Sequence, residues 1–307
     1  MALNSDLPHM KNIRIFPFLF ICLLTALMSC ESDVENMESL QVASKLVVTS
    51  YISPQDTLLT VRLQKSQPAI GKVMTEEQRK VKSATVTISN GRSVVALGYN
   101  PATDSYEADA KVWPIVAGET YHLVVVTSDG IRAEASCTVP ETTDIMITDI
   151  NAVSRIEENG WSGPVQKYSI TLEWLDAPDV TNYYRTLAYK EYTIADSYGN
   201  THTYKDELYF VNGASGLKND VRTAAGLLVS DKMEYYQYGD LPTSGPTLIH
   251  AILVVSDRPY YLYHESLQKQ ASFDGNPFAE PSVMYTNIEG GIGVFGGYNQ
   301  LEAVEEL

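Results

Sequence analysis

One cysteine stands in a sequence context that would permit covalent chemistry. Cys30 ends the run Leu27-Met28-Ser29-Cys30, with an apolar residue three positions before it and a small residue directly before it. This spacing resembles a bacterial lipobox, in which the cysteine sulfur takes a diacylglyceryl group before the signal is cleaved. The alternative is an ordinary secretory signal with a chance cysteine. We expect lipidation of Cys30.

The residues before this cysteine have the pattern of an export signal. Lys11 and Arg14 supply positive charge, and an almost unbroken apolar run follows at residues 15–28. A membrane-spanning helix needs about 20 apolar residues, so this shorter run is typical of a signal peptide. The sequence therefore predicts a lipoprotein signal peptide over residues 1–29.

The chain is strongly acidic. It has 307 residues with 22 Lys and Arg against 38 Asp and Glu, a formal charge of -16. Nucleic-acid binding requires clustered basic residues, so we expect no nucleic-acid partner. An acidic surface gains nothing from anionic lipids, so attachment to a membrane would depend on the lipid anchor itself.

Residues 30–42 are expected to form an acidic tether. Glu31, Asp33, Glu35 and Glu38 follow the cysteine closely but are separated by other residues. Such acidic residues resemble a surface-export signal in some lipoproteins, whereas the alternative is a solvated spacer.

Two local motifs resemble enzyme signatures, but each departs from the pattern that its chemistry requires. Residues 291–296 satisfy G-x-G-x-x-G, but only 11 residues follow Gly296, too few for the helix and acidic residue of a dinucleotide site. We expect close backbone packing or a β-bulge there. His264 and Glu265 resemble a zincin motif whose second histidine is replaced by Gln268, so we expect packing at a helix.

Acidic pairs are the remaining polar candidates. Asp176 with Asp179, and Asp206 with Glu207, have the residue types for acid–base work or calcium binding. Their spacing matches no calcium loop, so solvated loop charges are the favoured interpretation. We therefore predict no catalytic residue, no metal and no cofactor, and we do not expect an enzyme. Cys137 lies in an alternating apolar run and is expected to be a small buried side chain.

Residues 43–140 have the pattern of an immunoglobulin- or fibronectin-like β-sandwich. Short apolar-alternating runs are separated by turns, among them Asn90-Gly91 and Asp129-Gly130. Residue 121 is a tyrosine near the start of one run, where it is either a tyrosine-corner analogue or an ordinary sandwich tyrosine.

Residues 141–307 are expected to form a second, tyrosine-rich β domain, because 16 of the 20 tyrosines follow residue 150. Predicted strands occupy residues 144–152 and 168–175, a hairpin at 182–194 and 201–210, and a buried run at 247–255. A short helix is predicted over residues 257–270, with Asp257 as its cap. A strand pair at 283–288 and 293–298 is expected to close the chain. The fold class is thus mainly all-β.

Several tyrosines are candidates for a ligand or partner surface, because tyrosine offers a flat ring and a hydroxyl at low entropic cost. Alternation along the predicted strand puts Tyr183 and Tyr189 on one face and Tyr184 and Tyr192 on the other. Tyr235 and Tyr236 cluster in a second region. Tyrosine also favours strands, so core packing is the competing interpretation.

Three segments together resemble one family of Bacteroidota lipoproteins, catalogued only as a domain of unknown function (forty-two forty-nine). They are NPFAEPSVMYTNIEGGIGVFGGY at residues 276–298, LVVTSYISP at 46–54, and the Asn182-Tyr183-Tyr184 segment. The resemblance implies an outer-membrane location, facing the periplasm or the cell surface, and frequent pairing with TonB-dependent receptors. It supplies no catalytic residues.

These patterns predict a lipid-anchored accessory protein that binds a ligand, a TonB-dependent transporter, or both, in nutrient uptake. The alternative is a structural or adhesive surface lipoprotein, and an enzyme of unrecognised type is the third possibility.

Overall fold

Strands dominate the described chain, which confirms the expectation of a mainly β protein. The computed structural model describes residues 44–68, 73–159, 163–220, 226–238, 243–273 and 283–307. The predicted signal peptide, the predicted lipidation site Cys30 and the predicted acidic tether lie outside these residues.

The first strands form two layers around one core. The sheet contains β17, β1, β2, β5, β4, β3, β6 and β7 in that spatial order. β4 pairs with β3 through its first half and with β5 through its second half, so the sheet folds over on itself. The element bounds are β1 (Leu46–Ile52), β2 (Leu58–Lys65), α2 (Glu76–Arg79), β3 (Ala84–Ser89), β4 (Val94–Asn100), β5 (Ser105–Asp109), β6 (Thr120–Thr127) and β7 (Arg132–Thr138).

The core of this part comes from the alternation that the sequence predicted. Val48 and Val61 from one layer meet Ile88 and Leu123 from the other, and all four are almost completely buried. The predicted turns at Asn90-Gly91 and Asp129-Gly130 are confirmed, because they join β3 to β4 and β6 to β7. The Tyr121 hydroxyl accepts a 2.7 Å hydrogen bond from the Val116 N–H, which is the arrangement of a tyrosine corner.

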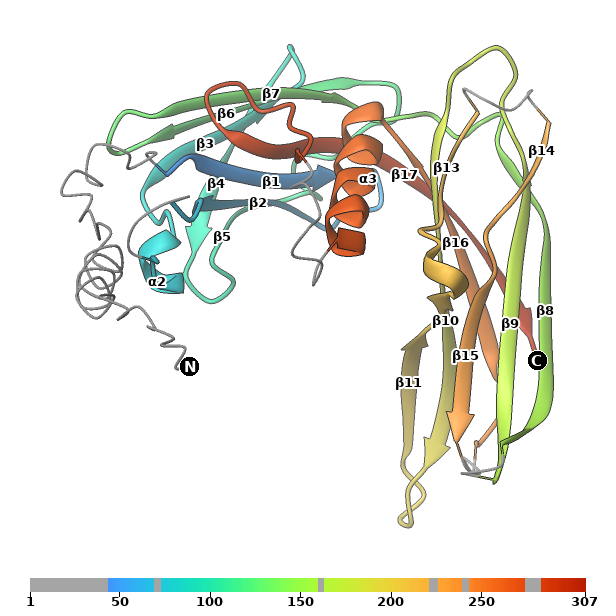
Figure 1. The fold of residues 1–307 in the computed structure, drawn as a ribbon. Coiled ribbons are helices and arrows are strands. Elements are labelled where there is room, and N and C mark those ends of the chain that lie inside the picture. Colours follow the sequence, from blue (N-terminus) through green and yellow to red (C-terminus); the bar gives the residue numbers. More distant parts are fainter. Residues whose placement is uncertain (1–43, 69–72, 160–162, 221–225, 239–242, 274–282) are drawn as a thin grey trace, which may run out of the picture. The chain divides into compact units, whose positions relative to one another are not determined.

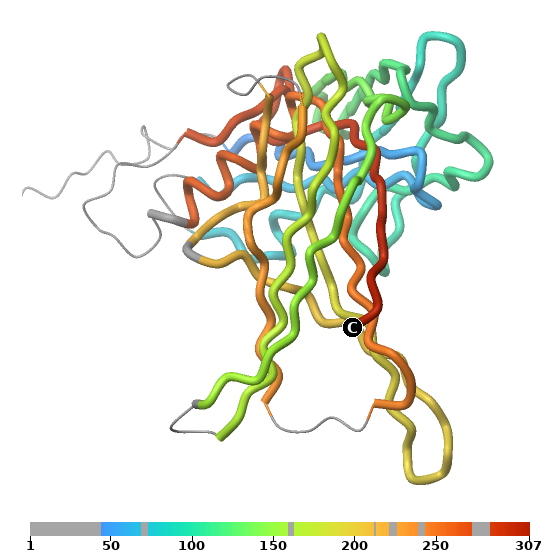
Figure 2. Tube along the Cα trace, turned by 90° about the vertical axis from the view of Figure 1, so that its right-hand side faces the viewer, coloured from blue at the N-terminus to red at the C-terminus, as the bar shows by residue number. Residues whose placement is uncertain are grey.

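The remaining strands form a second group. They are β8 (Met146–Asn159), β9 (Gly163–Leu175), β10 (Tyr183–Ala195), β11 (Thr201–Glu207), β12 (Tyr209–Phe210), β13 (Leu217–Asn219), β14 (Leu227–Val229), β15 (Met233–Tyr238), β16 (Leu248–Ser256) and β17 (Ile292–Glu306). A 3-10 turn covers Val211–Gly213. The predicted hairpin at 182–210 is confirmed, and both long hairpins, β8–β9 and β10–β11, extend past the C-terminal residue at the same end (Figure 2).

The last strand links the two groups of strands. β17 pairs in parallel with β1 through residues 292–297 and antiparallel with β16 through residues 298–306 (Figure 1). The resulting 12-stranded sheet runs from β11 and β10 through β16 and β17 into β1. The five-stranded sheet, made of β12, β15, β9, β14 and β8, packs against β10 and β16 through shared apolar side chains such as Leu172, Met233 and Leu253.

The predicted helix is confirmed as α3 (Arg258–Phe273), and Asp257 caps it. The Asp257 carboxylate accepts a 2.9 Å bond from the Tyr260 N–H and a 3.3 Å bond from the Thr138 N–H. The strand expected at 283–288 is wrong. Residues 283–287 are irregular, because Asn287 uses its side chain to bond the backbone of Phe295, and only a single bridge between Glu134 and Glu289 follows.

The glycine motif at residues 291–296 is explained by close backbone packing, as expected. Gly293 has φ +116°, and a Cβ atom there would lie 2.0 Å from the Val48 carbonyl oxygen. A Cβ on Gly296 would lie 3.0 Å from the Tyr260 Cβ. Glycine therefore lets β17 approach β1 on one side and α3 on the other. The expectation for Cys137 is also confirmed, since it is a free, buried thiol in the sandwich core.

Candidate functional site

The structure divides the six candidate tyrosines among three environments. Tyr184, Tyr192 and Tyr235 lie between the two sheets, whereas Tyr183 and Tyr189 occupy the opposite face of β10. Tyr236 lies on the far side of the five-stranded sheet. They therefore do not form one surface.

Tyr184 is a core residue. It is 0% exposed, its ring meets the edge of Trp174 at a centroid distance of 5.3 Å, and its hydroxyl donates to Asp176. The predicted alternation along β10 was right, but the face that carries Tyr184 and Tyr192 turns inward. The prediction that Tyr184 forms part of a ligand or partner surface is therefore wrong, because the side chain is fully buried.

Tyr192 and Tyr235 surround a lysine that sequence reasoning missed. The Lys190 side chain is 1% exposed, and its Nζ lies 4.3 Å from the Tyr192 ring centroid and 4.4 Å from that of Tyr235. Tyr168 completes the cage at 5.0 Å, and Gln237 accepts a 2.8 Å hydrogen bond from Nζ. Burial lowers the pKa of Lys190, while the nearby Asp206 charge opposes this effect. Cation–π contacts thus hold a buried ammonium between the sheets.

Tyr183 and Tyr189 are half-buried by neighbouring rings. Tyr183 packs against Tyr261 of α3 at 5.1 Å, and Tyr189 stacks on His250 of β16 at 4.4 Å with nearly parallel planes. Lys205 Nζ also lies over the Tyr189 ring, 4.6 Å from its centroid. Packing accounts for both rings.

The side of the five-stranded sheet that carries Tyr236 is the strongest candidate for a recognition surface. Ile170, Leu172 and Trp174 of β9 point into the core shared with β10 and β16, so the alternate residues of β9 point away from it. Residues paired in register share a face. We call this surface the outer face; it comprises Asp149, Asn151, Val153, Arg155, Glu157, Val165, Lys167, Ser169, Thr171, Glu173, Glu234, Tyr236 and Tyr238, together with Lys232, which directly precedes β15 and pairs with Glu234.

A buried carboxylate organises the outer face. Glu234 accepts bonds or ion pairs from Lys232 at 2.8 Å, Lys167 at 2.9 Å and the Tyr236 hydroxyl at 2.9 Å. Burial raises the pKa of Glu234, but its bonds from Lys232, Lys167 and Tyr236 outweigh burial and bring the pKa to about 2. The carboxylate therefore stays ionised and holds the buried Lys167 and the more exposed Lys232 in place.

Next to this network the outer face is hollowed. A cavity of about 320 Å³ is lined by Asn151, Val153, Arg155, Ser169, Ile170, Thr171 and Lys232. Most of these side chains are hydrogen-bond donors or cations. Lys167 lies 5.0 Å from the Tyr236 ring centroid, and the Tyr236 and Tyr238 side chains are 42% and 64% exposed. The arrangement suits a partner that brings hydroxyl or other hydrogen-bonding groups to the hollow and apolar surface to the rings.

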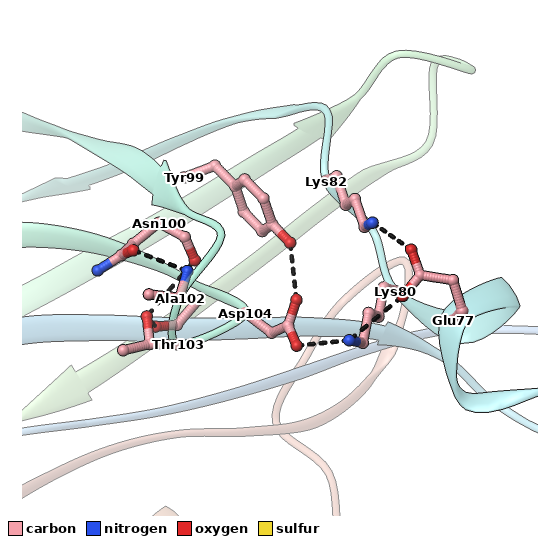
Figure 3. Close-up of polar contacts among 9 residues, drawn as sticks. Glu77, Lys80, Lys82, Tyr99, Asn100, Ala102, Thr103 and Asp104 are labelled. Carbon is pink, nitrogen blue, oxygen red and sulfur yellow. Dashed lines mark hydrogen bonds and ion pairs between the residues drawn. The ribbon is translucent and has the colours of Figure 1, made fainter.

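A second polar cluster lies on the sandwich, where it fastens the turn that follows β4 to α2. Figure 3 shows Lys80 between Asp104 and Glu77, at 2.6 and 3.3 Å, with the Tyr99 hydroxyl donating to Asp104 at 2.9 Å. Lys82 also pairs with Glu77. These ion pairs are exposed and mutually satisfied, so they explain local structure better than recognition.

The histidine of the zincin-like motif packs, as expected. The His264 ring stacks on Tyr260 at 4.2 Å, and its Nδ1 lies 2.9 Å from the Tyr260 carbonyl oxygen. Burial lowers the pKa of His264 to about 4, so the ring is neutral at pH 7. Over the residues that the structure covers, no three His, Cys, Asp or Glu side chains gather as metal ligands, and no helix is long and apolar enough to span a membrane.

The sequence identified Tyr236 as a candidate but not Lys167 and Glu234, which contact it. Lys167 and Glu234 are 67 positions apart and meet only because β9 and β15 pair. The one available signal was alternation within β15, which puts Glu234, Tyr236 and Tyr238 on the same side.

The comparisons with known proteins identify a family but no activity. No curated protein matches the chain. The family model described as domain of unknown function (DUF4249) matches residues 31–303, which confirms the resemblance inferred from the sequence. The chain therefore belongs to the DUF4249 family.

Proposed function

We propose that this protein is a lipid-anchored accessory protein of the outer membrane, and that its outer face recognises a ligand or a TonB-dependent transporter in nutrient uptake. The observation that carries the proposal is the hollow of about 320 Å³ beside Glu234, on the same face of the five-stranded sheet as the exposed Tyr236 and Tyr238.

The polar groups of the hollow support recognition. Arg155 and Lys232 line it together with Asn151, Ser169 and Thr171. Glu157 and Glu234 form ion pairs with Arg155, Lys167 and Lys232, so the outer face carries both signs of charge and no excess of cations. The ligand class that fits is therefore a hydroxyl-rich molecule, or a polar loop of a transporter.

The lipobox supports the location. Cys30 follows a signal-like segment, and the family match begins at the next residue. Two or three acyl chains on this cysteine would hold an acidic protein at a membrane without help from anionic lipids.

Co-purification tests the proposal. The tagged full chain is expressed in its source bacterium, extracted in mild detergent, and compared with a variant that carries Tyr236→Ala and Tyr238→Ala. We expect a TonB-dependent receptor to co-purify with the natural protein and to fall at least about five-fold in the variant, because interface tyrosines often contribute more than 1 kcal/mol.

The matched control is Tyr198→Ala, which removes a 90% exposed tyrosine from the β10–β11 turn. It should leave recovery unchanged. Equal recovery with the outer-face variant would reject the outer face as the contact surface, and no receptor with any protein would reject the transporter as its partner.

A structural or adhesive role is the alternative, and one observation favours it. Met146, Leu175 and Leu227 lie in register across β8, β9 and β14, and all three are exposed. Such a row suits contact with another protein. Recovery of a fimbrial or adhesin protein in place of a receptor would support this role.

A further inference from the structure

Two carboxylates from different sheets converge on one asparagine. Asp176 follows β9 of the five-stranded sheet, and Asp220 follows β13, which pairs with β10. The Asn182 Nδ2 donates to Asp176 Oδ1 at 3.1 Å, and its backbone N–H donates to Asp220 Oδ2 at 3.0 Å. The Tyr184 hydroxyl also donates to Asp176 Oδ1. One oxygen of each carboxylate is thereby fixed.

The second oxygen of each carboxylate has no partner. Asp176 is 6% exposed, and both Asp176 Oδ2 and Asp220 Oδ1 are buried without a hydrogen bond. In the part of the chain that the structure covers, no lysine or arginine pairs with either residue. Among the described residues, two carboxylate oxygens are thus buried without a donor or cation beside them, which is unfavourable.

Sequence reasoning had treated Asp176 as half of a solvated pair with Asp179. The structure separates these two residues, because Asp179 is exposed in the loop with φ +61° while Asp176 is buried beside Trp174 and Tyr184. The carboxylate that lies near Asp176 is Asp220, which is 44 positions away in the sequence. A local spacing rule could not have found it.

We propose that Asp176 and Asp220 bind a calcium ion through these two unpartnered oxygens. Both are carboxylate oxygens, which favour a hard cation over zinc or copper. Calcium accepts irregular oxygen sites more readily than magnesium does, and its other positions would be filled by water and by amide or carbonyl oxygens. The ion would join the end of β9 to the end of β13, which pairs with β10, and so fasten the two sheets together.

Luminescence of bound Tb³⁺, which replaces Ca²⁺ in oxygen sites, tests the proposal directly. The Trp174 ring lies 5.3 Å from Tyr184, which bonds Asp176, so excitation of the tryptophan should sensitise a bound ion. The purified full chain is treated with EDTA and titrated with Tb³⁺. We expect sensitised emission that added Ca²⁺ displaces, and its loss in Asp220→Asn and Asp176→Asn.

Thermal unfolding supplies the second measurement. With Ca²⁺ at about ten times its dissociation constant, the midpoint should rise by about 3–6 °C relative to EDTA. Asp220→Asn should lose this rise, yet in EDTA it should unfold at the same or a higher temperature than the natural protein, because a buried carboxylate oxygen without a donor or cation is gone. Asp149→Asn removes an exposed charge from the same sheet and should keep the calcium response.

Two results would overturn the proposal. One is the absence of sensitised emission together with the same unfolding midpoint in Ca²⁺ and in EDTA. That result would mean that Asp176 and Asp220 share a proton and bind no ion. The other is emission of equal strength from the natural protein and from Asp220→Asn.

Discussion

Tyr235 and Tyr236 are neighbours in β15, yet they contact two different lysines on opposite faces of the five-stranded sheet. The Tyr235 ring lies 4.4 Å from Nζ of Lys190, which is buried between the sheets. The Tyr236 ring lies 5.0 Å from Nζ of Lys167, which forms part of the outer face. The same dipeptide therefore stabilises the interior and contributes to the proposed recognition surface.

Replacement of the buried lysine by an apolar residue of similar length should be tolerated. Lys190→Met keeps the volume and removes a charge that burial penalises, so we expect its free energy of unfolding at pH 7 to lie within about 1 kcal/mol of the natural value or above it. Lys190→Ala should lose about 2–4 kcal/mol, since it leaves a cavity. Urea denaturation measures both.

The stability difference between the natural protein and Lys190→Met should also depend on pH, in a direction that the pKa of Lys190 sets. Because the pKa of Lys190 is lowered in the folded protein, the unfolded chain binds the proton more tightly between that pKa and 10.5. The natural protein should therefore gain stability relative to Lys190→Met as the pH rises from 7 toward about 10. A difference that stays constant or falls would contradict the assigned burial.

Glu234 should stabilise the outer face at neutral pH. Its pKa is about 2 in the folded protein against 4.5 ordinarily, so its contribution is present above pH 4.5 and is lost as the pH falls toward 2. Glu234→Gln should cost about 2–4 kcal/mol at pH 7 and progressively less below pH 4.5.

Glu173→Gln is the matched control for this change, because Glu173 lies on the outward side of β9. We expect an effect within about 0.5 kcal/mol. If Glu234→Gln costs no more than the control in urea denaturation at pH 7, the network does not organise this face.

The helix cap should respond to pH in the opposite direction. Burial raises the pKa of Asp257 from 3.8 to about 7, although bonds from backbone N–H groups partly oppose it. Its stabilising contribution is complete below pH 3.8 and declines as the pH rises through 7. Asp257→Asn keeps the cap without the charge, so it should gain about 1–3 kcal/mol on the natural protein between pH 4 and pH 8. Guanidinium unfolding at the two pH values decides this, and an unchanged difference would refute it.

The close approach of β17 to β1 should make Gly293 intolerant of a side chain. Gly293→Ala places a Cβ atom 2.0 Å from the Val48 carbonyl oxygen at φ +116°, and we expect a loss of more than about 3 kcal/mol. Gly98→Ala, where the added atom meets nothing within 4 Å, should change stability by less than about 1 kcal/mol. Similar thermal midpoints for the two variants would contradict the packing account.

Local patterns predicted much of the fold because alternation and turn chemistry act over a few residues. The Asn90-Gly91 turn, the buried strand β16 and the Asp257 cap were all visible in the sequence. The second half of β17 was missed, since residues 299–306 are mostly polar and become a strand by pairing with β16.

The candidate site was less predictable because it depends on pairing between distant strands. Lys190 stands between Tyr189 and Glu191 and resembles an exposed charge, although it shares its face of β10 with Tyr184 and Tyr192. Nothing local says which face turns inward, since both carry tyrosines. The ion pair of Lys167 with Glu234 likewise exists only once β9 and β15 are side by side.

The most direct measurement of the central claim is photo-crosslinking in living cells, with a benzophenone amino acid in place of Tyr236 and, as the comparison, in place of Tyr198. The proposed recognition surface predicts a crosslinked adduct of defined mass from position 236 and none from position 198. An absence of adduct at 236, or equal adducts at both positions, would contradict it.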